Sequence, residues 1–203
     1  MNTSMQPPSI RLEDERVLLR PLEIGDVKHL LSISENEPEN WSFGLESAAG
    51  EANLIRYIES ALQSAKELHS YPFIIFDKQI GHYAGSTRYY QIQHKHKRLA
   101  IGYTWIGNAF KQTGLNAHCK LLLLTHAFES LSMERVEFMA DTRNERSINS
   151  ILALGAKSEG TLRSHALRPD GTRRDTAVLS ILKQEWLEQV KPSLIQKISG
   201  RNA

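Results

Sequence analysis

The spacing of apolar residues predicts an alternation of helices and strands along most of the chain. Apolar side chains recur at helical spacing in 51–67 and again at Leu121, Leu124, Phe128 and Leu131. Short runs of β-branched and aromatic residues, bounded by turn-forming residues, predict strands. The expected helices are 26–34, 51–67, 118–131, 144–154 and 185–198, and the expected strands are 17–22, 71–76, 79–92, 99–106, 134–142, 157–167 and 172–182.

This order of elements predicts one α+β domain over 10–198, preceded by a flexible N-terminal tail over 1–9. A strand and two helices come first, and a three-strand meander follows. Next come a helix, a strand and a helix, then a terminal hairpin and a last helix. Gly81 and Gly85 inside the second strand of the meander indicate a bulge or a close approach of another backbone. Asp26 is placed as an N-cap.

The composition narrows the class of protein without identifying it. The chain has 203 residues, a formal net charge of +2 and 40% hydrophobic residues, which is ordinary for a soluble globular protein. The single Cys119 excludes an internal disulfide framework and fits a reducing cytoplasm. No signal peptide or membrane span is expected. The basic run 94–98 is expected to be a solvated hairpin loop. A nucleic-acid binder using this run is a weaker alternative, which predicts steep salt dependence.

The segment 111–117, between a strand and the leucine-rich helix, has the form of a phosphate-binding turn. A short loop containing Gly114 directs free backbone N–H groups and the positive end of the helix dipole to one point. The chain contains neither GxxxxGK followed by serine or threonine nor GxGxxG, which argues against a P-loop NTPase and a Rossmann dinucleotide site. The alternative is that Gly114 merely permits a tight turn before a core helix.

The loop residues Lys111, Gly114 and Asn116 resemble the pyrophosphate loop of the GNAT acetyltransferases. In that loop, arginine or glutamine stands at the first of these positions and glycine or alanine at the last. Two further stretches, 141–156 and 159–175, resemble the branch of the family typified by the ribosomal-protein acetyltransferases RimJ and RimL. The resemblance implies a central, twisted, mixed sheet of about seven strands, with helices on both faces. Its central strands 102–106 and 135–142 should part at a bulge.

The resemblance implies acetyl-coenzyme A as the co-substrate and no metal. The pyrophosphate would lie in the loop, and the pantetheine arm would enter the opening between the parted strands. Backbone groups near Trp105 and Ile106 would hold the acetyl carbonyl. The implied cofactor-binding residues are Trp105, Ile106, Lys111, Gln112, Thr113, Gly114, Leu115, Asn116, Ala117, Asn144 and Ser147.

Ser147 is the first candidate for a catalytic residue. Many GNAT enzymes have a tyrosine that protonates the departing thiolate, but Ile151 occupies that position here. Ser147 stands where those enzymes have alanine, as in the RimJ and RimL branch, and its hydroxyl is expected to hydrogen-bond the sulfur of coenzyme A. The alternative is a serine that bonds to local backbone in the first helical turn. Asn144 is expected to be the N-cap of the same helix.

His165 is the second catalytic candidate, as the general base. The resemblance places a glutamate of the RimL-type enzymes at Ala166, so that group is absent. An ordinary histidine has a pKa of ~6.5 and accepts a proton near neutrality. Neighbours in a strand face opposite sides, so His165 reaches the site only if the strand bulges. Asp175 would orient it. A structural or surface histidine, with water relaying the proton, is the alternative.

Trp41, Phe43 and Tyr89 are expected to line the acceptor side, although each is also ordinary core material. The resulting hypothesis is an acetyl-coenzyme A-dependent N-acetyltransferase that acts on a primary amine, with a protein N-terminal α-amine as the favoured acceptor. A small-molecule amine such as a polyamine, amino acid or antibiotic is the first alternative. A coenzyme A-binding module without turnover is the second. The family's members are often dimers, and the sequence leaves the oligomeric state open.

Overall fold

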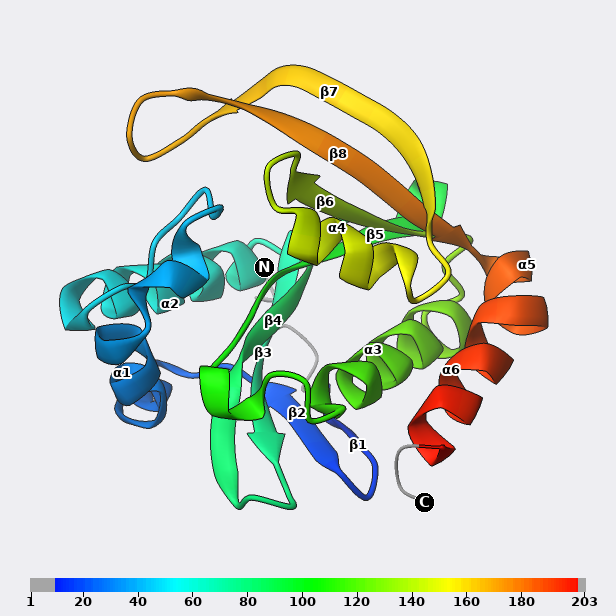
Figure 1. The fold of residues 1–203 in the computed structure, drawn as a ribbon, viewed down its shortest axis with the longest axis horizontal. Coiled ribbons are helices and arrows are strands. Elements are labelled where there is room, and N and C mark those ends of the chain that lie inside the picture. Colours follow the sequence, from blue (N-terminus) through cyan, green and yellow to red (C-terminus); the bar gives the residue numbers. More distant parts are fainter. Residues whose placement is uncertain (1–9, 201–203) are drawn as a thin grey trace, which may run out of the picture.

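One mixed sheet of eight strands organises the structure, a computed structural model that describes residues 10–200 (Figure 1). The strand order is β1-β2-β3-β4-β5-β6-β8-β7. The strands are β1 (Leu12–Glu13), β2 (Val17–Pro21), β3 (Ser70–Asp77), β4 (His82–Gln93), β5 (Arg98–Ile106), β6 (Arg135–Asp141), β7 (Lys157–Leu167) and β8 (Arg173–Leu182). Seven match the predicted strands, and the two-residue β1 is additional. The predicted tail 1–9 lies outside the described residues.

Helices cover both faces of this sheet, as predicted. They are α1 (Val27–Asn36), α2 (Glu51–Lys66), α3 (Leu115–Thr125), α4 (Glu145–Leu152), α5 (Lys183–Glu185) and α6 (Lys191–Ser199). Adjacent residues of β4 show the two faces, because neighbours in a strand point to opposite sides. Arg88 packs over the ring of Tyr57 from α2, whereas the Tyr89 hydroxyl donates to the carbonyl oxygen of Leu123 in α3. None of the helices within 10–200 is long and apolar enough to span a bilayer.

The two central strands β5 and β6 run parallel and part after three residue pairs. Only Arg98–Ala100 pairs with Arg135–Glu137, while β6 pairs with β8 along its whole length. Parallel strands need a crossover connection, and α3 provides it. The β6-facing edge of β5 therefore carries unpaired backbone groups from position 101 onward. The predicted separation of these strands is confirmed.

A bulge in β5 accompanies the separation. Gly102 pairs with Arg88 and Trp105 pairs with Ser86, so two residues, Tyr103 and Thr104, lie opposite one. Tyr103 has φ of 50°, a left-handed conformation that is uncommon for a bulky residue. The bulge rotates the following residues and ends regular pairing, which is the usual effect of an extra residue in one strand.

Gly85 in β4 is required for the close contact between β4 and the end of β5. Its φ is 155°, and a Cβ at this position would lie 2.0 Å from the carbonyl oxygen of Trp105. The predicted close approach at Gly85 is confirmed. Gly81 lies in the β3–β4 turn instead of a strand, because the carboxylate of Asp77 accepts the backbone N–H groups of Gln79 and Ile80 and fixes that turn.

Asp26 is the N-cap residue of α1, as predicted, but its carboxylate makes no capping bond to that helix. It accepts hydrogen bonds from the Arg20 guanidinium and from the backbone N–H of Glu23. The carboxylate is buried, and a buried charge is more stable beside an oppositely charged partner.

Candidate functional site

The loop before α3 presents several main-chain donors together. Gly114 is the N-cap of α3 with φ of 92°, and Gln112 also has a positive φ of 65°. The Thr113 hydroxyl donates to the carbonyl oxygen of Phe110 at 2.8 Å and holds the turn in place. Within 10–200 the structure gives no partner for the backbone N–H groups of Gln112, Thr113, Gly114 and Asn116. Free N–H groups at a helix N-terminus form an anion-binding site.

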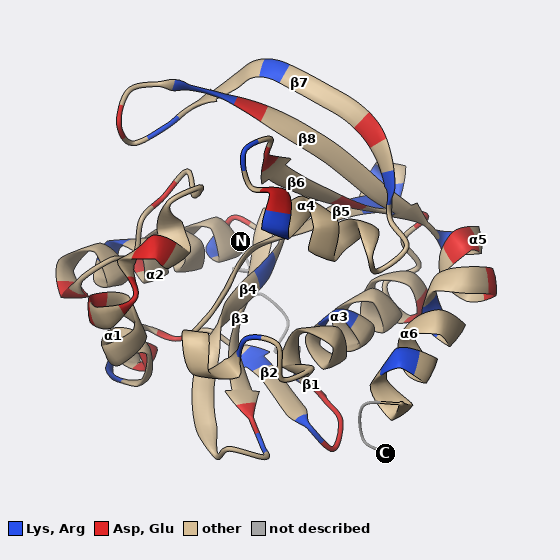
Figure 2. Ribbon diagram, viewed as in Figure 1, with Lys and Arg blue, Asp and Glu red and all other residues tan. Residues whose placement is uncertain are grey.

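Two basic side chains accompany these donors. The Lys111 ammonium donates to the side-chain oxygens of Asn40, at 2.6 Å, and Asn108. Burial lowers the pKa of Lys111, and the positive charge of Arg146 lowers it further, which places the two cations near each other. Figure 2 marks the corresponding basic positions in the loop and in the first turn of α4. Arg146 was missed in the sequence, although it stands between Asn144 and Ser147.

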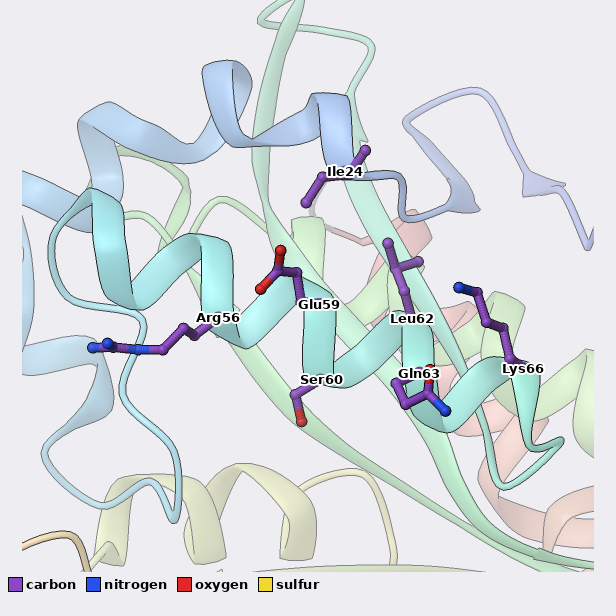
Figure 3. A pocket seen from close by; sticks show the side chains of 7 residues that line it. All are labelled: Ile24, Arg56, Glu59, Ser60, Leu62, Gln63 and Lys66. Carbon is purple, nitrogen blue, oxygen red and sulfur yellow. The ribbon is translucent and has the colours of Figure 1, made fainter.

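Two cavities differ in their relation to this loop. One, of about 700 Å³, lies against it and is lined by Thr113, Gly114, Ala117 and His118, together with Arg16, Gln79, Ile80 and Ile198. The other is an open hollow of about 600 Å³ along α2, lined by Ile24, Arg56, Glu59, Ser60, Leu62, Gln63 and Lys66 (Figure 3). It shares no residue with the loop.

The first turn of α4 positions Asn144 and Ser147. Asn144 is the N-cap, and its side-chain oxygen accepts the backbone N–H of Ser147 at 3.0 Å. The amide group of Asn144 therefore keeps its NH₂ donors available. The half-buried Ser147 hydroxyl has no hydrogen-bond partner within the described residues, so it does not bond to local backbone. Its proton is free to reach a group placed beside the helix.

His165 lies on a bulged part of β7. Leu162 pairs with Thr176 and Ala166 with Arg174, so three residues of β7 lie opposite one of β8. The bulge brings the Nδ1 atom of His165 to 3.1 Å from the Thr176 hydroxyl. The prediction that Asp175 orients His165 is wrong, because this carboxylate accepts the backbone N–H of Ser164 at 2.6 Å. The ring of His165 is exposed.

The three predicted acceptor residues do not lie together. The buried Trp41 packs edge-on against Trp105, with ring centroids 5.1 Å apart. Phe43 is exposed and lies under the guanidinium of Arg143. Tyr89 is fully buried on the α3 face, with its hydroxyl 2.6 Å from the Leu123 carbonyl oxygen. The prediction that Tyr89 lines the acceptor side is corrected, because side chains alternate along β4 and the Tyr89 ring points away from the α2 face.

Arg88, the residue before Tyr89 in β4, lies on the α2 face of the sheet. Its guanidinium carbon lies 4.7 Å from the ring centroid of Tyr57 and 3.9 Å from that of Tyr103, and the residue is 3% exposed. Arg174 of β8 is 7% exposed and makes a long contact, 3.5 Å, with the carbonyl oxygen of Phe43. The sequence signal for Arg88 was an arginine within an otherwise uncharged strand segment.

A different buried cation lies on the α3 face. Lys120 of α3 donates to the Thr104 hydroxyl at 3.2 Å and lies 5.9 Å from the ring centroid of Phe138 in β6. Thr104 also bonds to the Thr87 hydroxyl at 2.7 Å. Burial lowers the pKa of Lys120 to about 8. This side chain therefore lies between the parted strands β5 and β6.

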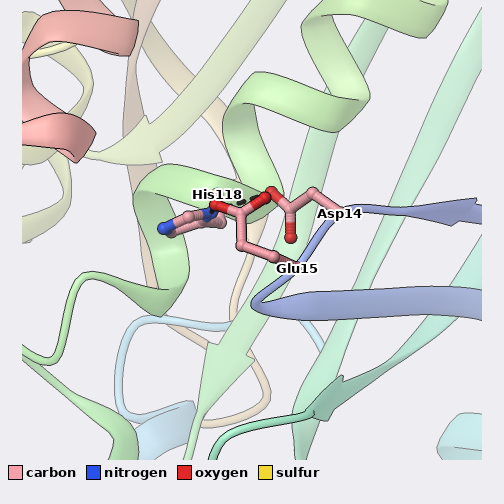
Figure 4. A group of neighbouring side chains, drawn as sticks. All are labelled: Asp14, Glu15 and His118. Atoms are coloured by element: carbon pink, nitrogen blue, oxygen red, sulfur yellow. Dashed lines mark hydrogen bonds and ion pairs between the residues drawn. The ribbon is translucent and has the colours of Figure 1, made fainter. Parts of the chain in front are cut away.

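Asp14, Glu15 and His118 form a small group of potential metal ligands (Figure 4). The Nδ1 atom of the buried His118 lies 2.8 Å from a carboxylate oxygen of Asp14, and 3.9 Å from one of the exposed Glu15. The short contact with Asp14 connects the turn between β1 and β2 to the first turn of α3. Its evident role is to anchor the helix that carries Gly114.

Comparisons with known proteins give one family match and several similar proteins. The family described as "Acetyltransferase (GNAT) domain" matches residues 16–157. The "Putative ribosomal N-acetyltransferase YdaF" of Bacillus subtilis (strain 168) is 25% identical over 178 residues, covering 85% of this chain and 94% of that protein. A "putative acetyltransferase" of T. thermophilus is 33% identical, with a TM-score of 0.82 and coverage of 97% and 98%. Mycobacterium smegmatis RimJ in complex with CoA-disulfide shares the fold, with 20% identity, a TM-score of 0.77 and coverage of 99% and 98%.

Proposed function

The chain belongs to the GNAT acetyltransferase family, and from this premise we propose that it transfers the acetyl group of acetyl-coenzyme A to a primary amine. We propose a protein N-terminal α-amine as the acceptor. The similarity to a protein named for ribosomal N-acetyl transfer supports this choice. The observation that carries the proposal is the combination of free N–H groups around Gly114 with the unpaired edge of β5.

The loop fits the pyrophosphate of coenzyme A. Four backbone donors, from Gln112, Thr113, Gly114 and Asn116, have no partner among the described residues, and Lys111 and Arg146 add positive charge nearby. Main-chain N–H groups at a helix N-terminus bind phosphate without needing a particular side chain. This explains how lysine and asparagine can stand where the family usually has other residues.

The unpaired edge of β5 fits the pantetheine arm and the thioester. Backbone groups beyond Ala100 lack partners on β6, and an extended amide-containing chain can pair with them as a strand would. Backbone N–H groups near Trp105 and Ile106 would polarise the acetyl carbonyl as its oxygen gains charge. Much of the rate gain should come from holding the two reactants in contact.

Ser147 is proposed to assist departure of the thiolate. Its hydroxyl has no partner within the described residues, and Asn144 fixes the turn that carries it. Ile151, at the position of the tyrosine found in many relatives, is buried and has no proton to donate. The serine hydroxyl is thus the group of α4 suited to hydrogen-bonding the sulfur.

The acceptor amine must lose a proton before it attacks the thioester. We propose His165 as the group that takes this proton, directly or through water, since the bulge in β7 turns it toward Thr176. The α2 face of the sheet carries the buried arginines Arg88 and Arg174 and is a poor environment for a polyamine. This charge distribution favours the proposed α-amine acceptor over a polyamine.

Two measurements test the proposal together. Calorimetry with coenzyme A tests the loop, and release of free thiol from acetyl-coenzyme A with a panel of peptides and small amines tests turnover. Binding together with acceptor-dependent thiol release is expected. Binding of coenzyme A without thiol release for any amine would instead indicate a coenzyme A-binding module. Absence of coenzyme A binding would contradict acetyl transfer by this chain.

A further inference from the structure

A group of buried polar atoms on the α2 face lacks partners. We call it the Arg88 cluster: Arg88, Arg174, Tyr57, Tyr103, Trp41 and Trp105. Within 10–200, no hydrogen-bond partner exists for Nε and Nη2 of Arg88, Nε of Arg174, or Nε1 of either Trp41 or Trp105. Buried polar groups in proteins are nearly always hydrogen-bonded, so this concentration of free donors needs an explanation.

Arg88 is the member whose position is hardest to explain by packing. An arginine stays protonated in proteins, so burial does not neutralise it. The rings of Tyr57 and Tyr103 pack against the flat side of its guanidinium and partly stabilise the charge. The N–H groups point outward in the guanidinium plane, where ring stacking does not satisfy them. The edge of the guanidinium thus remains available for a planar acceptor such as a carboxylate.

Arg174 brings a second positive charge to the same place from another part of the chain. It lies on β8, and its contact with the Phe43 carbonyl joins the β7–β8 hairpin to the loop between α1 and α2 (Figure 1). Burial raises the pKa of Tyr103, and the charges of Arg88, Glu46 and Arg174 also act on it. Of these three groups, Arg88 lies directly against the ring of Tyr103.

The neighbouring carboxylates do not neutralise the two arginines. Glu137 accepts hydrogen bonds from Arg98 and Arg135. Asp141 is held by Arg143 and Arg168. Glu46 makes no ion pair within the described residues, and its buried Oε2 atom has no hydrogen-bond partner. Within 10–200, Arg88 and Arg174 thus have no carboxylate partner, and one oxygen of Glu46 has no hydrogen-bond donor.

We propose that Arg88 and Arg174 bind an anionic group of the acceptor, so that the substrate is an amine carrying a carboxylate close to the reacting nitrogen. The assignment rests on the proposed acetyl transfer and names its substrate class. Tyr103 lies two residues before Trp105, whose backbone is proposed to hold the acetyl carbonyl, so the anion would bind beside the reaction centre. A free amino acid and a peptide with an acidic residue near its N-terminus share this chemistry.

The test compares acceptors that differ in one charge, with kcat/KM expressed on the concentration of the unprotonated amine, because a neighbouring carboxylate makes the amine more basic than a neighbouring amide does. Each pair joins a carboxylate to its amide: alanine with alaninamide, and a peptide beginning Ala-Asp with one beginning Ala-Asn. The wild-type chain should use the charged member with a kcat/KM about tenfold or more above that of the amide, as expected for a charge-assisted hydrogen bond. A preference in the first pair indicates a free amino acid, and a preference in the second indicates an acidic peptide.

Substitutions in the Arg88 cluster test whether its arginines cause the preference for charged acceptors. Arg88→Met and Arg174→Met should each reduce the preference about tenfold, leaving the KM for acetyl-coenzyme A unchanged. Arg88→Lys keeps the charge but loses the planar pair of donors, and it should retain part of the preference. Arg56→Met is the matched control, because Arg56 is exposed on α2 and should leave the preference intact. Calorimetry of the wild type with the acetylated carboxylate product and its amide gives the same comparison if a variant fails to fold.

The outcomes separate this inference from the proposed function. Coenzyme A binding and acetyl transfer with equal use of charged and amide acceptors would overturn the anion site and leave the acetyltransferase intact. A charge preference that survives both methionine substitutions would also overturn it. Failure of the wild type to bind coenzyme A would overturn both proposals.

Discussion

Strand β5 borders two regions, one formed by backbone groups and the other by side chains. On the side of β6 and α3, the candidate donor site consists of backbone groups: the unpaired strand edge and the N–H groups around Gly114. On the α2 face, the Arg88 cluster consists of side chains from segments distant in sequence. A site made of backbone groups depends on the conformation of the chain and tolerates different side chains. A site made of side chains depends on which residues stand there.

The buried cations of the two regions differ in the same way. Lys120 on the α3 face has a pKa lowered by burial to about 8, so its ammonium loses the proton in mildly alkaline solution. Arg88 on the α2 face carries a guanidinium group, and guanidinium groups stay charged in proteins. The comparison indicates that Lys120 can dispense with an anionic partner by losing its proton, whereas Arg88 is stabilised by an anionic ligand.

The largest expected effect concerns Lys120, whose charge should destabilise the fold. Its folded pKa of about 8 lies below the ordinary 10.5, so the unfavourable contribution is fully present below pH 8 and is lost as pH rises from 8 to 10.5. Lys120→Met should raise the unfolding free energy by up to about 3 kcal/mol at pH 7, from a shift of roughly 2.5 pKa units. Urea unfolding at pH 7 and pH 10 measures this.

The pH dependence provides the control for this substitution. The advantage of Lys120→Met should shrink between pH 8 and pH 10.5, because the wild type gains stability while the variant does not. Thr104 keeps its hydrogen bond to Thr87, so the substitution leaves no unpaired hydroxyl. A methionine variant that is less stable than the wild type at pH 7 would contradict the predicted cost of the buried charge and would give the ammonium a stabilising role.

The second prediction tests whether the donor site depends on backbone shape. Gly114→Val places a β-branched residue at φ of 92°, which is strained and should rotate the loop N–H groups. The dissociation constant for coenzyme A should rise about 30-fold, equivalent to about 2 kcal/mol. Gly171→Val is the matched control, with φ of 81° in the β7–β8 turn and open space around it. Equal weakening by both variants would argue against a local role for Gly114.

The sequence predicted the backbone-built region well. The place of the loop and the order of the elements follow from glycine positions and hydrophobic periodicity, whereas the parting of β5 from β6 was implied by the family resemblance. Gly85 was correctly recognised as a close contact, and the cap at Asn144 was expected. Asp26 was correctly placed at the N-cap of α1, but the ion pair of its carboxylate with Arg20, on a different element, was not foreseen.

The side-chain region could not be predicted in the same way. The two-residue bulge at Tyr103 and Thr104 decides which side chains of β5 face α2, and no local pattern in the sequence reveals it. Tyr89 was predicted to line the acceptor side because it is aromatic. Side chains alternate along β4, so Arg88 lies on the α2 face and Tyr89 lies on the α3 face. Arg174 and Glu46 approach Tyr103 from segments far apart in the chain, so their proximity follows only from the folded structure.

The third prediction tests the role of Ser147 in the chemical step. Ser147→Ala removes the free hydroxyl of α4 and should lower kcat about tenfold, the loss expected from one hydrogen bond to a developing charge. Binding of coenzyme A should change less than about twofold. Ser150→Ala, on the exposed side of the same helix, is the control. Unchanged turnover at saturating acceptor would remove Ser147 from the mechanism and leave positioning by the backbone as the main contribution.

The smallest expected effect tests whether side chains add to the backbone site at all. Arg146 is exposed and lies close enough to Lys111 to lower its pKa, so the two positive charges repel each other until an anion lies near them. Arg146→Ala should weaken coenzyme A binding about threefold at low salt, as expected for an exposed charge. The difference should disappear at high salt, because screening acts strongly on exposed charges. Arg56→Ala should leave binding unchanged at every salt concentration. If Arg146→Ala instead weakens binding by a salt-independent factor, the guanidinium makes a direct contact, and the donor side depends on side-chain identity as much as the α2 face does.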